Sequence, residues 1–125
     1  LATGSSDLSI RLWDTASWSA SRIYRGHTRQ VYALRFTPDG TRLFSGDDLG
    51  YVKEWSVVSE RNLGDRWVLG RHSGVINQVT YSPDGTLLAT AAGNWETNDD
   101  KTARLWHAET GALAGILEGH TGAVR

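Results

Sequence analysis

One group of residues in the chain has the parts of a hydrolytic triad. His72, Thr90 and Asp100 supply an imidazole, a hydroxyl and a carboxylate, the three groups with which many hydrolases activate a nucleophile. However, threonine normally needs a different base arrangement to act as a nucleophile, and the chain contains no Gly-x-Ser-x-Gly elbow. A histidine and a hydroxyl recur at the same interval as His27 and Ser45. This recurrence indicates a structural role, so we expect no enzyme activity.

The residue types argue against a metal site, a phosphate-binding loop and a nucleic-acid-binding surface. His27, His72 and His120 are roughly 45 residues apart, one in each repeat, so they do not converge easily on a metal ion. The chain has no cysteine and no Gly-rich loop followed by Lys-Ser or Lys-Thr. Thirteen basic and fourteen acidic residues leave a net charge of -1, without the excess of positive charge typical of nucleic-acid binders. We expect no cofactor, no nucleic-acid partner and, since no long apolar run occurs, no membrane partner.

The chain repeats one of its segments. "RGHTRQVYALRFTPDG" at residues 25–40 matches "GRHSGVINQVTYSPDG" at residues 70–85 without a gap, and a third copy begins at His120. A period of about 45 residues suits a blade of four strands better than a two-helix repeat of about 34 residues. The repeat therefore predicts a row of small antiparallel sheets.

Short apolar and β-branched runs, separated by turn residues, take the place of helical periodicity. Each "TPDG" or "SPDG" segment predicts a tight hairpin, because proline fixes φ for a turn and glycine supplies a positive φ. The expected strands are residues 1–3, 10–13, 31–36, 43–45, 51–55, 75–81, 87–90 and 102–106.

The spacing of apolar residues in the repeat departs from a regular strand. One face of a regular strand recurs at every second residue, so a step of three implies one extra residue, a β-bulge, at the same place in both copies. The larger apolar residues are Val31, Leu34 and Phe36 in one copy and Ile76, Val79 and Tyr81 in the other.

These residues resemble the WD-repeat (tryptophan-aspartate repeat) β-propellers, whose repeat runs from Gly-His through a Pro-Asp-Gly turn to Trp-Asp. "LATGSSDLSIRLWD" at residues 1–14 is similar to the second half of such a repeat. Ser56 and His107 depart from the pattern after tryptophan, and Arg71 departs from it before histidine. The resemblance implies an incomplete all-β propeller segment of antiparallel four-stranded blades. Residues 1–26 would form part of a blade, 27–71 and 72–119 two blades, and 120–125 the first strand of the next.

The resemblance also implies a hydrogen-bonded tetrad in each blade, in which an indole, a hydroxyl, an imidazole and a carboxylate follow one another. Such a chain satisfies four buried polar groups together. In the repeat at His27, counting back from tryptophan places Leu49 where aspartate belongs, and Asp48 is the expected substitute. The implied members are His72, Thr90, Asp100 and Trp106, then His27, Ser45 and Trp55, then Thr3, Asp7 and Trp13, with His120 opening the next set.

Family resemblance further implies that the third and fifth residues after each histidine line the top face, where protein or peptide partners bind. Tyr32 is the best single anchor, because it is large, amphipathic and loses little entropy on binding. The arginines at 22, 25, 29, 35 and 42 fit either an acidic or phosphorylated peptide or a solvated edge. The implied top-face residues are Gln30, Tyr32, Val75, Asn77, Ala123 and Arg125.

One hairpin carries an insertion. The interval from Thr90 to Trp106 is longer than the equivalent intervals in the other repeats, and the added residues lie within "AGNWETNDD". Trp95 in this loop is of a type enriched in binding hot spots, and the alternative is that it folds back to cover its own blade.

Taken together, the sequence predicts a non-catalytic scaffold for protein–protein interaction. The alternative is a regulatory sensor propeller within a larger signalling ATPase or kinase. Because a repeat unit cannot bury its core alone, we expect further blades from the same chain or from other copies. We also expect an intracellular protein, cytoplasmic or nuclear.

Overall fold

The computed structural model describes residues 1–58, 68–94, 96–97 and 100–125 of the chain. The described residues form β-strands and turns, and none of them is helical. The strands are β1 (Ala2–Gly4), β2 (Ser9–Trp13), β3 (Ala20–Arg25), β4 (Val31–Phe36), β5 (Arg42–Asp47), β6 (Tyr51–Ser56), β7 (Val68–Arg71), β8 (Ile76–Tyr81), β9 (Leu87–Ala92), β10 (Ala103–His107) and β11 (Leu113–Leu117).

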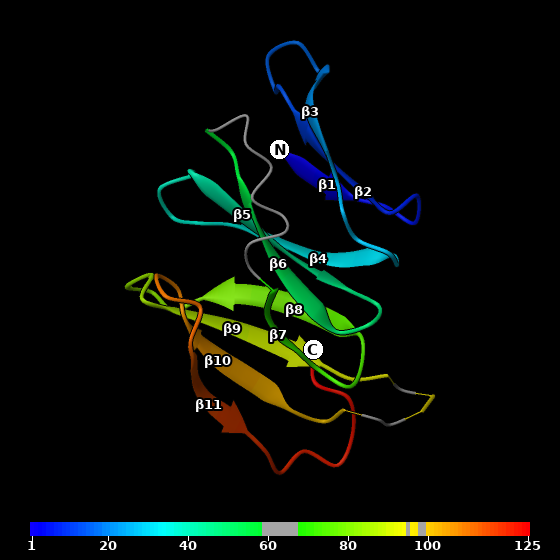
Figure 1. Cartoon of the computed structure of the whole chain (residues 1–125), viewed down its shortest axis with the longest axis vertical. Coiled ribbons are helices and arrows are strands. Elements are labelled where there is room, and N and C mark those ends of the chain that lie inside the picture. Colours follow the sequence, from blue (N-terminus) through cyan, green and yellow to red (C-terminus); the bar gives the residue numbers. More distant parts are fainter. Residues whose placement is uncertain (59–67, 95, 98–99) are drawn as a thin grey trace.

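The strands form three antiparallel sheets in which neighbours in sequence are neighbours in space. One sheet has the order β1-β2-β3, the second β4-β5-β6-β7 and the third β8-β9-β10-β11. Figure 1 shows the sheets following one another along the long axis of the molecule, with β1–β3 at one end and β8–β11 at the other. The predicted all-β class and four-stranded antiparallel blades are thereby confirmed.

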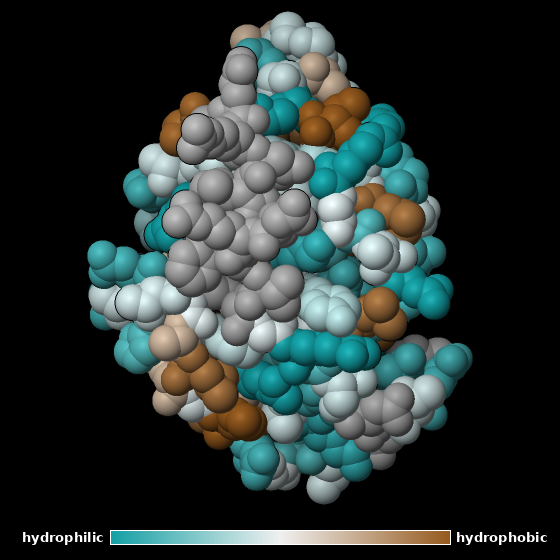
Figure 2. All heavy atoms as spheres, in the orientation of Figure 1, coloured by the Kyte–Doolittle hydropathy of each residue, from teal (hydrophilic) through white to brown (hydrophobic). Residues whose placement is uncertain are grey.

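In each sheet the last strand along the chain, β3, β7 or β11, is the element that the apolar pattern missed. β3 and β11 lie at sheet edges and expose most of their residues, so neither shows the alternation of apolar and polar residues that marks a half-buried strand. Figure 2 shows a hydrophobic patch over β11, where Leu113, Ile116 and Leu117 are exposed.

Both predicted bulges are present at the predicted place. The β4–β5 register shifts between Val31 and Ala33, which leaves Tyr32 as the extra residue. The β8–β9 register shifts between Ile76 and Gln78, which leaves Asn77 in the same position. A bulge redirects the side chain of its extra residue, so the side chains of Tyr32 and Asn77 leave the regular alternation of their strands.

Neighbouring sheets enclose two apolar clusters. One contains Ile10 and Leu12 of the first sheet with Leu43 and Trp55 of the second. The other joins the second sheet to the third and includes Phe44, Val52, Ile76, Leu88 and Trp106.

Close approach of successive sheets depends on a small residue in the second strand of a blade. A Cβ atom added to Gly46 would overlap the side chain of Ile76, and one added to Gly4 would overlap Val31. In both cases the neighbour is the residue at the start of the next blade, so the two glycines set the spacing between blades.

Side-chain donors also connect each blade to the next through backbone carbonyls. Tyr24 donates its hydroxyl to the carbonyl of Ser56 at 2.6 Å, and Arg104 Nη1 donates to the carbonyl of Arg71 at 2.6 Å. Arg42 Nη1 donates to the carbonyl of Ala108 at 3.2 Å. These bonds satisfy carbonyl groups at the C-terminal ends of β6, β7 and β10 and fix how neighbouring blades lie.

Residues 120–125, expected as the first strand of a further blade, form no strand in the structure. The N–H of Val124 donates to the carbonyl of Ala92 at 3.1 Å, as the N–H of Val31 does to Ser5 at 3.4 Å. A first strand pairs with the second strand of its own blade, and among the described residues no strand follows β11.

Candidate functional site

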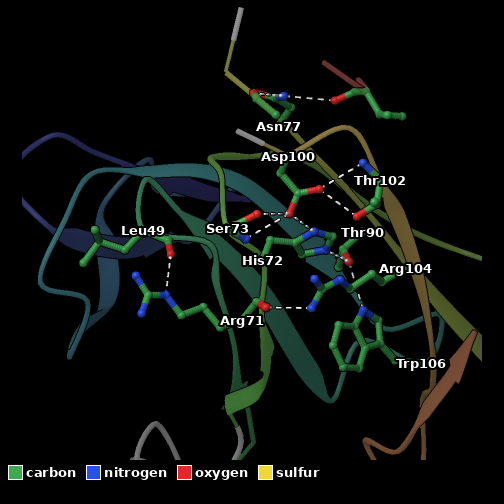
Figure 3. A network of polar contacts seen from close by, with 12 residues as sticks. Leu49, Arg71, His72, Ser73, Asn77, Thr90, Asp100, Thr102, Arg104 and Trp106 are labelled. Carbon is green, nitrogen blue, oxygen red and sulfur yellow. Dashed lines mark hydrogen bonds and ion pairs between the residues drawn. The ribbon is translucent and has the colours of Figure 1, made fainter. Parts of the chain in front are cut away.

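The residues with triad chemistry form a continuous chain of hydrogen bonds with Trp106 at the third sheet. Trp106 Nε1 donates to Thr90 Oγ1 at 2.9 Å, Thr90 Oγ1 lies 2.8 Å from His72 Nε2, and His72 Nδ1 lies 3.1 Å from a carboxylate oxygen of Asp100. Figure 3 shows the four side chains contributed by β9, β10 and the loops that precede β8 and β10.

The direction of each hydrogen bond follows from the indole at one end. An indole N–H can only donate, so the hydroxyl of Thr90 accepts from Trp106 and is free to donate its own proton to Nε2 of His72. The imidazole then carries its proton on Nδ1 and donates it to Asp100. This is the neutral form of histidine, with its acceptor nitrogen already occupied.

Burial and hydrogen bonding keep the two ionisable groups in these states. Burial lowers the pKa of His72 below its usual value of 6.5, and the charge of Arg104 lowers it further, whereas Asp100 acts in the opposite direction. Burial alone would raise the pKa of Asp100, but hydrogen bonds from Thr102 and Ser73 lower it from 3.8 to about 2. A neutral imidazole therefore lies beside a carboxylate that stays ionised.

The second sheet repeats the arrangement around His27. Trp55 Nε1 donates to Ser45 Oγ at 2.7 Å, Ser45 Oγ lies 2.5 Å from His27 Nε2, and His27 Nδ1 lies 2.7 Å from the carboxylate of Asp47. Ser45 and Thr90 are both 0% exposed. Neither hydroxyl can reach a substrate from solution, and this geometry argues against hydrolysis at either set.

The carboxylate that completes this second set is not the one expected from the sequence. Counting from Trp55 pointed to Leu49 and then to Asp48, whereas the structure uses Asp47, the last residue of β5. One Asp47 oxygen accepts the N–H groups of Leu49 and Tyr51, each at 3.0 Å, and the other faces His27. The expectation for Asp48 is wrong because the path of the turn, not the distance in sequence, decides which carboxylate reaches the imidazole.

The first sheet contains the indole–hydroxyl bond of the tetrad and an aspartate equivalent to Asp100. Trp13 Nε1 donates to Thr3 Oγ1 at 2.8 Å. Asp7 accepts the backbone N–H and the hydroxyl of Ser9 at 2.9 and 2.6 Å, in the way that Asp100 accepts both groups of Thr102. His120, which was expected to open another set, is exposed.

A pocket of about 230 Å³ lies where the two bulges meet the inserted loop, and we call it the top-face pocket. It unites three of the predicted top-face residues, and it includes three residues that sequence reasoning did not single out. The longer Thr90-to-Trp106 interval was the available signal for these last three. The pocket is lined by Tyr32, Val75, Asn77, Gly93, Asn94 and Glu96.

The remaining predicted top-face residues do not line this pocket. Gln30 lies beside it and accepts the hydroxyl proton of Tyr32 at 2.6 Å. Ala123 packs against Gly93, and Arg125 is exposed. Trp95, predicted as a hot spot or as a cover for its blade, lies outside the described residues.

Asn77 is fixed in place and also holds the pocket together. Its Nδ2 donates to the carbonyl oxygens of Gly93 and Val124 at 2.8 and 2.9 Å, and Figure 3 shows Asn77 above the tetrad with one of these bonds drawn. Asn77 thus connects the bulge of β8 to the loop after β9 and to the C-terminal segment.

Arg22 and Arg42 of the basic segment are engaged within the fold. Arg22 donates to the carbonyls of Ser56 and Val57 at 3.3 and 3.1 Å, and Arg42 forms an ion pair with Glu54 at 3.2 Å. These two side chains therefore do not extend freely toward a partner.

Neither a metal cluster nor a membrane span was found in the parts of the chain that the structure describes. No three His, Cys, Asp or Glu side chains of those residues gather as a metal site requires. Among the same residues, no helix has the length and hydropathy needed to cross a membrane.

The chain is similar to several known proteins. The family model described as "WD domain, G-beta repeat" matches residues 18–56 and 65–107. The chain is similar to nuclear distribution protein PAC1 of Arthroderma otae, at 34% identity over all of this chain and 28% of the relative. It is also similar to a probable coatomer subunit beta' of Schizosaccharomyces pombe, at 36% identity over 84% of this chain and 12% of the relative.

A third relative is transcription initiation factor TFIID subunit 5 of Caenorhabditis elegans, at 31% identity over 75% of this chain and 14% of the relative. The chain thus spans less than a third of the length of each of these relatives. Since the family model matches more than half of the residues and the sheets are those of its repeats, the chain belongs to the WD-repeat family.

Proposed function

We propose that this chain is part of a non-catalytic propeller that binds protein or peptide partners on its top face, through the top-face pocket and the loops around it. The observation that carries the proposal is the convergence of Tyr32, Val75 and Asn77 with the inserted loop in one pocket. Membership in a family whose repeats serve as protein-interaction scaffolds supports it, as does the complete burial of the Ser45 and Thr90 hydroxyls.

Tyr32 is the proposed anchor of the surface. It is 57% exposed, because the bulge near the start of β4 turns its side chain out of the β4 ladder. The hydrogen bond to Gln30 orients the ring before a partner arrives. An exposed, oriented aromatic ring has little conformational entropy to lose on binding, which favours affinity.

The names of the three relatives refer to different processes or complexes: nuclear distribution, a coatomer and transcription initiation. We infer that the blade framework is shared and that surface residues choose the partner. We also propose an intracellular location, which suits all three relatives.

The blade boundaries belong to the same proposal. Residues 27–71 and 72–119 would each be one blade, residues 1–26 part of another, and 120–125 the first strand of a blade that further residues complete. The sheets β4–β7 and β8–β11 lie within these boundaries. Further blades, from the same chain or from other copies, would cover the outer faces of the first and third sheets.

The test is partner binding by Tyr32 variants of the intact protein that carries these blades. A partner is captured with the wild-type protein and its affinity is then measured by calorimetry. We expect Tyr32→Ala to weaken binding by more than about 1 kcal/mol with unchanged unfolding, while Tyr32→Phe retains most of the affinity. Trp18→Ala, in the turn between β2 and β3, is the control for an exposed aromatic elsewhere. Equal affinity for wild type and Tyr32→Ala would place the binding site on other blades.

A further inference from the structure

The top-face pocket has an unbalanced charge. Among its described lining residues, Glu96 is the only one that is charged at neutral pH, and none is a lysine, arginine or histidine. The side chain of Asn94 accepts the N–H of Glu96 at 2.8 Å, which forms a local turn and fixes the backbone from which the carboxylate extends. A negative charge therefore stands at the rim of a pocket with no positive charge on its described walls.

The uncharged walls suit a long side chain that ends in a cation. Tyr32 presents an aromatic ring, whose face attracts an ammonium or guanidinium group. Val75 adds an apolar surface on which the methylene groups of such a side chain can pack. At about 230 Å³ the pocket is smaller than the usual range for cofactors and drug-sized ligands, and this favours a single side chain as its occupant.

Asn77 contributes an acceptor in place of a donor. Both hydrogens of its Nδ2 are directed to the carbonyls of Gly93 and Val124, so the amide oxygen is the remaining polar atom of the side chain. An oxygen acceptor complements a cationic donor and repels an anion.

From these features we infer that the top-face pocket receives a lysine or arginine side chain of a protein partner. The inference rests on the proposed function, because it names the chemistry of a partner for that same surface. An acidic or phosphorylated segment would meet Glu96 as a like charge, which is unfavourable, and it would find no basic group on the described walls.

The experiment uses four pentapeptides, Gly-Gly-X-Gly-Gly, in which X is arginine, citrulline, lysine or norleucine. Citrulline has the shape of arginine without its charge, and norleucine has the stem of lysine without its ammonium group. Binding to the intact protein is measured by saturation-transfer NMR titration. We expect the arginine and lysine peptides to bind about fivefold more tightly than their neutral counterparts, the ratio that an exposed ion pair supplies.

Three variants test whether the preference for a charged peptide arises in the top-face pocket. Glu96→Gln should reduce the preference for charge, and Tyr32→Ala should weaken the binding of all four peptides. Glu109→Gln, which changes an exposed acid outside the pocket, should leave both properties intact.

Two results would overturn the inference. Equal binding of charged and neutral peptides would show that Glu96 does not select the occupant. A preference for charge that is undiminished in Glu96→Gln would place the basic side chain elsewhere on the protein. In either case the calorimetric test of Tyr32→Ala with a whole partner still decides the proposed function separately.

Discussion

At the scale of single residues, each tetrad depends on a carboxylate that can reach its histidine. Asp47 and Asp48 are adjacent, yet only Asp47 lies against His27, while the N–H of Asp48 bonds to the carbonyl of Gln30 at 3.1 Å. An imidazole proton buried without an acceptor costs about 1 to 3 kcal/mol. The two neighbouring aspartates therefore have very different energetic roles.

This difference predicts the outcome of a matched pair of substitutions. Asp47→Asn should lower the free energy of unfolding by about 1 to 3 kcal/mol, because it weakens the bond to His27 and the two backbone bonds at the end of β5. Asp48→Asn should change it by less than about 0.5 kcal/mol. Urea unfolding of the intact protein measures both. Similar losses for the two variants would contradict the assignment of Asp47.

The hydroxyl at the centre of the tetrad allows a second residue-scale prediction. Thr90→Val keeps the shape of the side chain but leaves the Trp106 indole and the His72 imidazole buried without their common partner. We expect a loss of about 1 to 3 kcal/mol in unfolding free energy. Thr102→Val, in a half-buried position beside Asp100, is the control, and we expect it to lower the unfolding free energy by less than Thr90→Val does. A loss below about 0.5 kcal/mol for Thr90→Val would mean that the chain of bonds adds no stability.

At the scale of elements, the turn between β2 and β3 places an unusual residue in a left-handed conformation. Trp18 has φ 54°, and the equivalent residue of the third sheet is Gly111 with φ 71°. The turns match, since Trp18 N–H donates to Asp14 and Gly111 N–H to His107, both at 2.8 Å. Bulky residues at such φ values are strained, and Trp18 is also 69% exposed.

Trp18→Gly should therefore stabilise the protein. Relief of the strain is worth about 1 kcal/mol, part of which is offset by the greater freedom of glycine in the unfolded chain. Trp18→Ala removes the indole but keeps the strained φ, so it should show no comparable gain. Thermal unfolding of the two variants compares them directly. A midpoint for Trp18→Gly at or below that of Trp18→Ala would argue against strain in this turn.

The turn between β1 and β2 also has a non-glycine residue with positive φ where another sheet has glycine. Leu8 has φ 70°, and the equivalent residue in the second sheet is Gly50 with φ 83°. Both non-glycine residues with positive φ among the described residues thus lie in the first sheet, each where another sheet has glycine. The fold imposes the turn conformation even where the residue does not favour it, because hydrogen bonds on both sides of the turn fix its ends.

At the scale of the whole molecule, stability should depend on pH through the buried His72–Asp100 pair. The folded state lowers the pKa of His72 below 6.5, so the unfolded chain takes up this proton first as the pH falls. The stabilisation is complete above about pH 6.5 and declines below it. For Asp100 the pKa falls from 3.8 to about 2, so its contribution is present above 3.8 and is lost as the pH falls toward 2.

Unfolding free energies of the intact protein at several pH values test this dependence. We expect a decrease between pH 7.5 and 5 from His72 and a further decrease below pH 4 from Asp100. His120→Gln, which changes an exposed histidine, should leave the first decrease unchanged. An equal unfolding free energy at pH 7.5 and 5 would contradict a buried neutral His72.

The sequence by itself determined the period, the hairpin turns and the bulges. These features depend on local backbone chemistry: proline and glycine fix the turns, and the three-then-two spacing from Val31 and from Ile76 marks the extra residue in each strand. The outer strands β3 and β11 left little trace in the sequence, because a mostly exposed edge strand needs no alternating pattern.

Only the tertiary structure decided which aspartate completes the second tetrad and which residues form the top-face pocket. Asp47 displaces the expected Asp48 because the path of a turn in three dimensions, and not a count along the chain, brings one carboxylate to His27. The pocket joins Tyr32, Asn77 and Glu96 from two bulges and an inserted loop. Their proximity depends on how one blade packs against the next, and a sequence pattern confined to single strands carries no information about that packing.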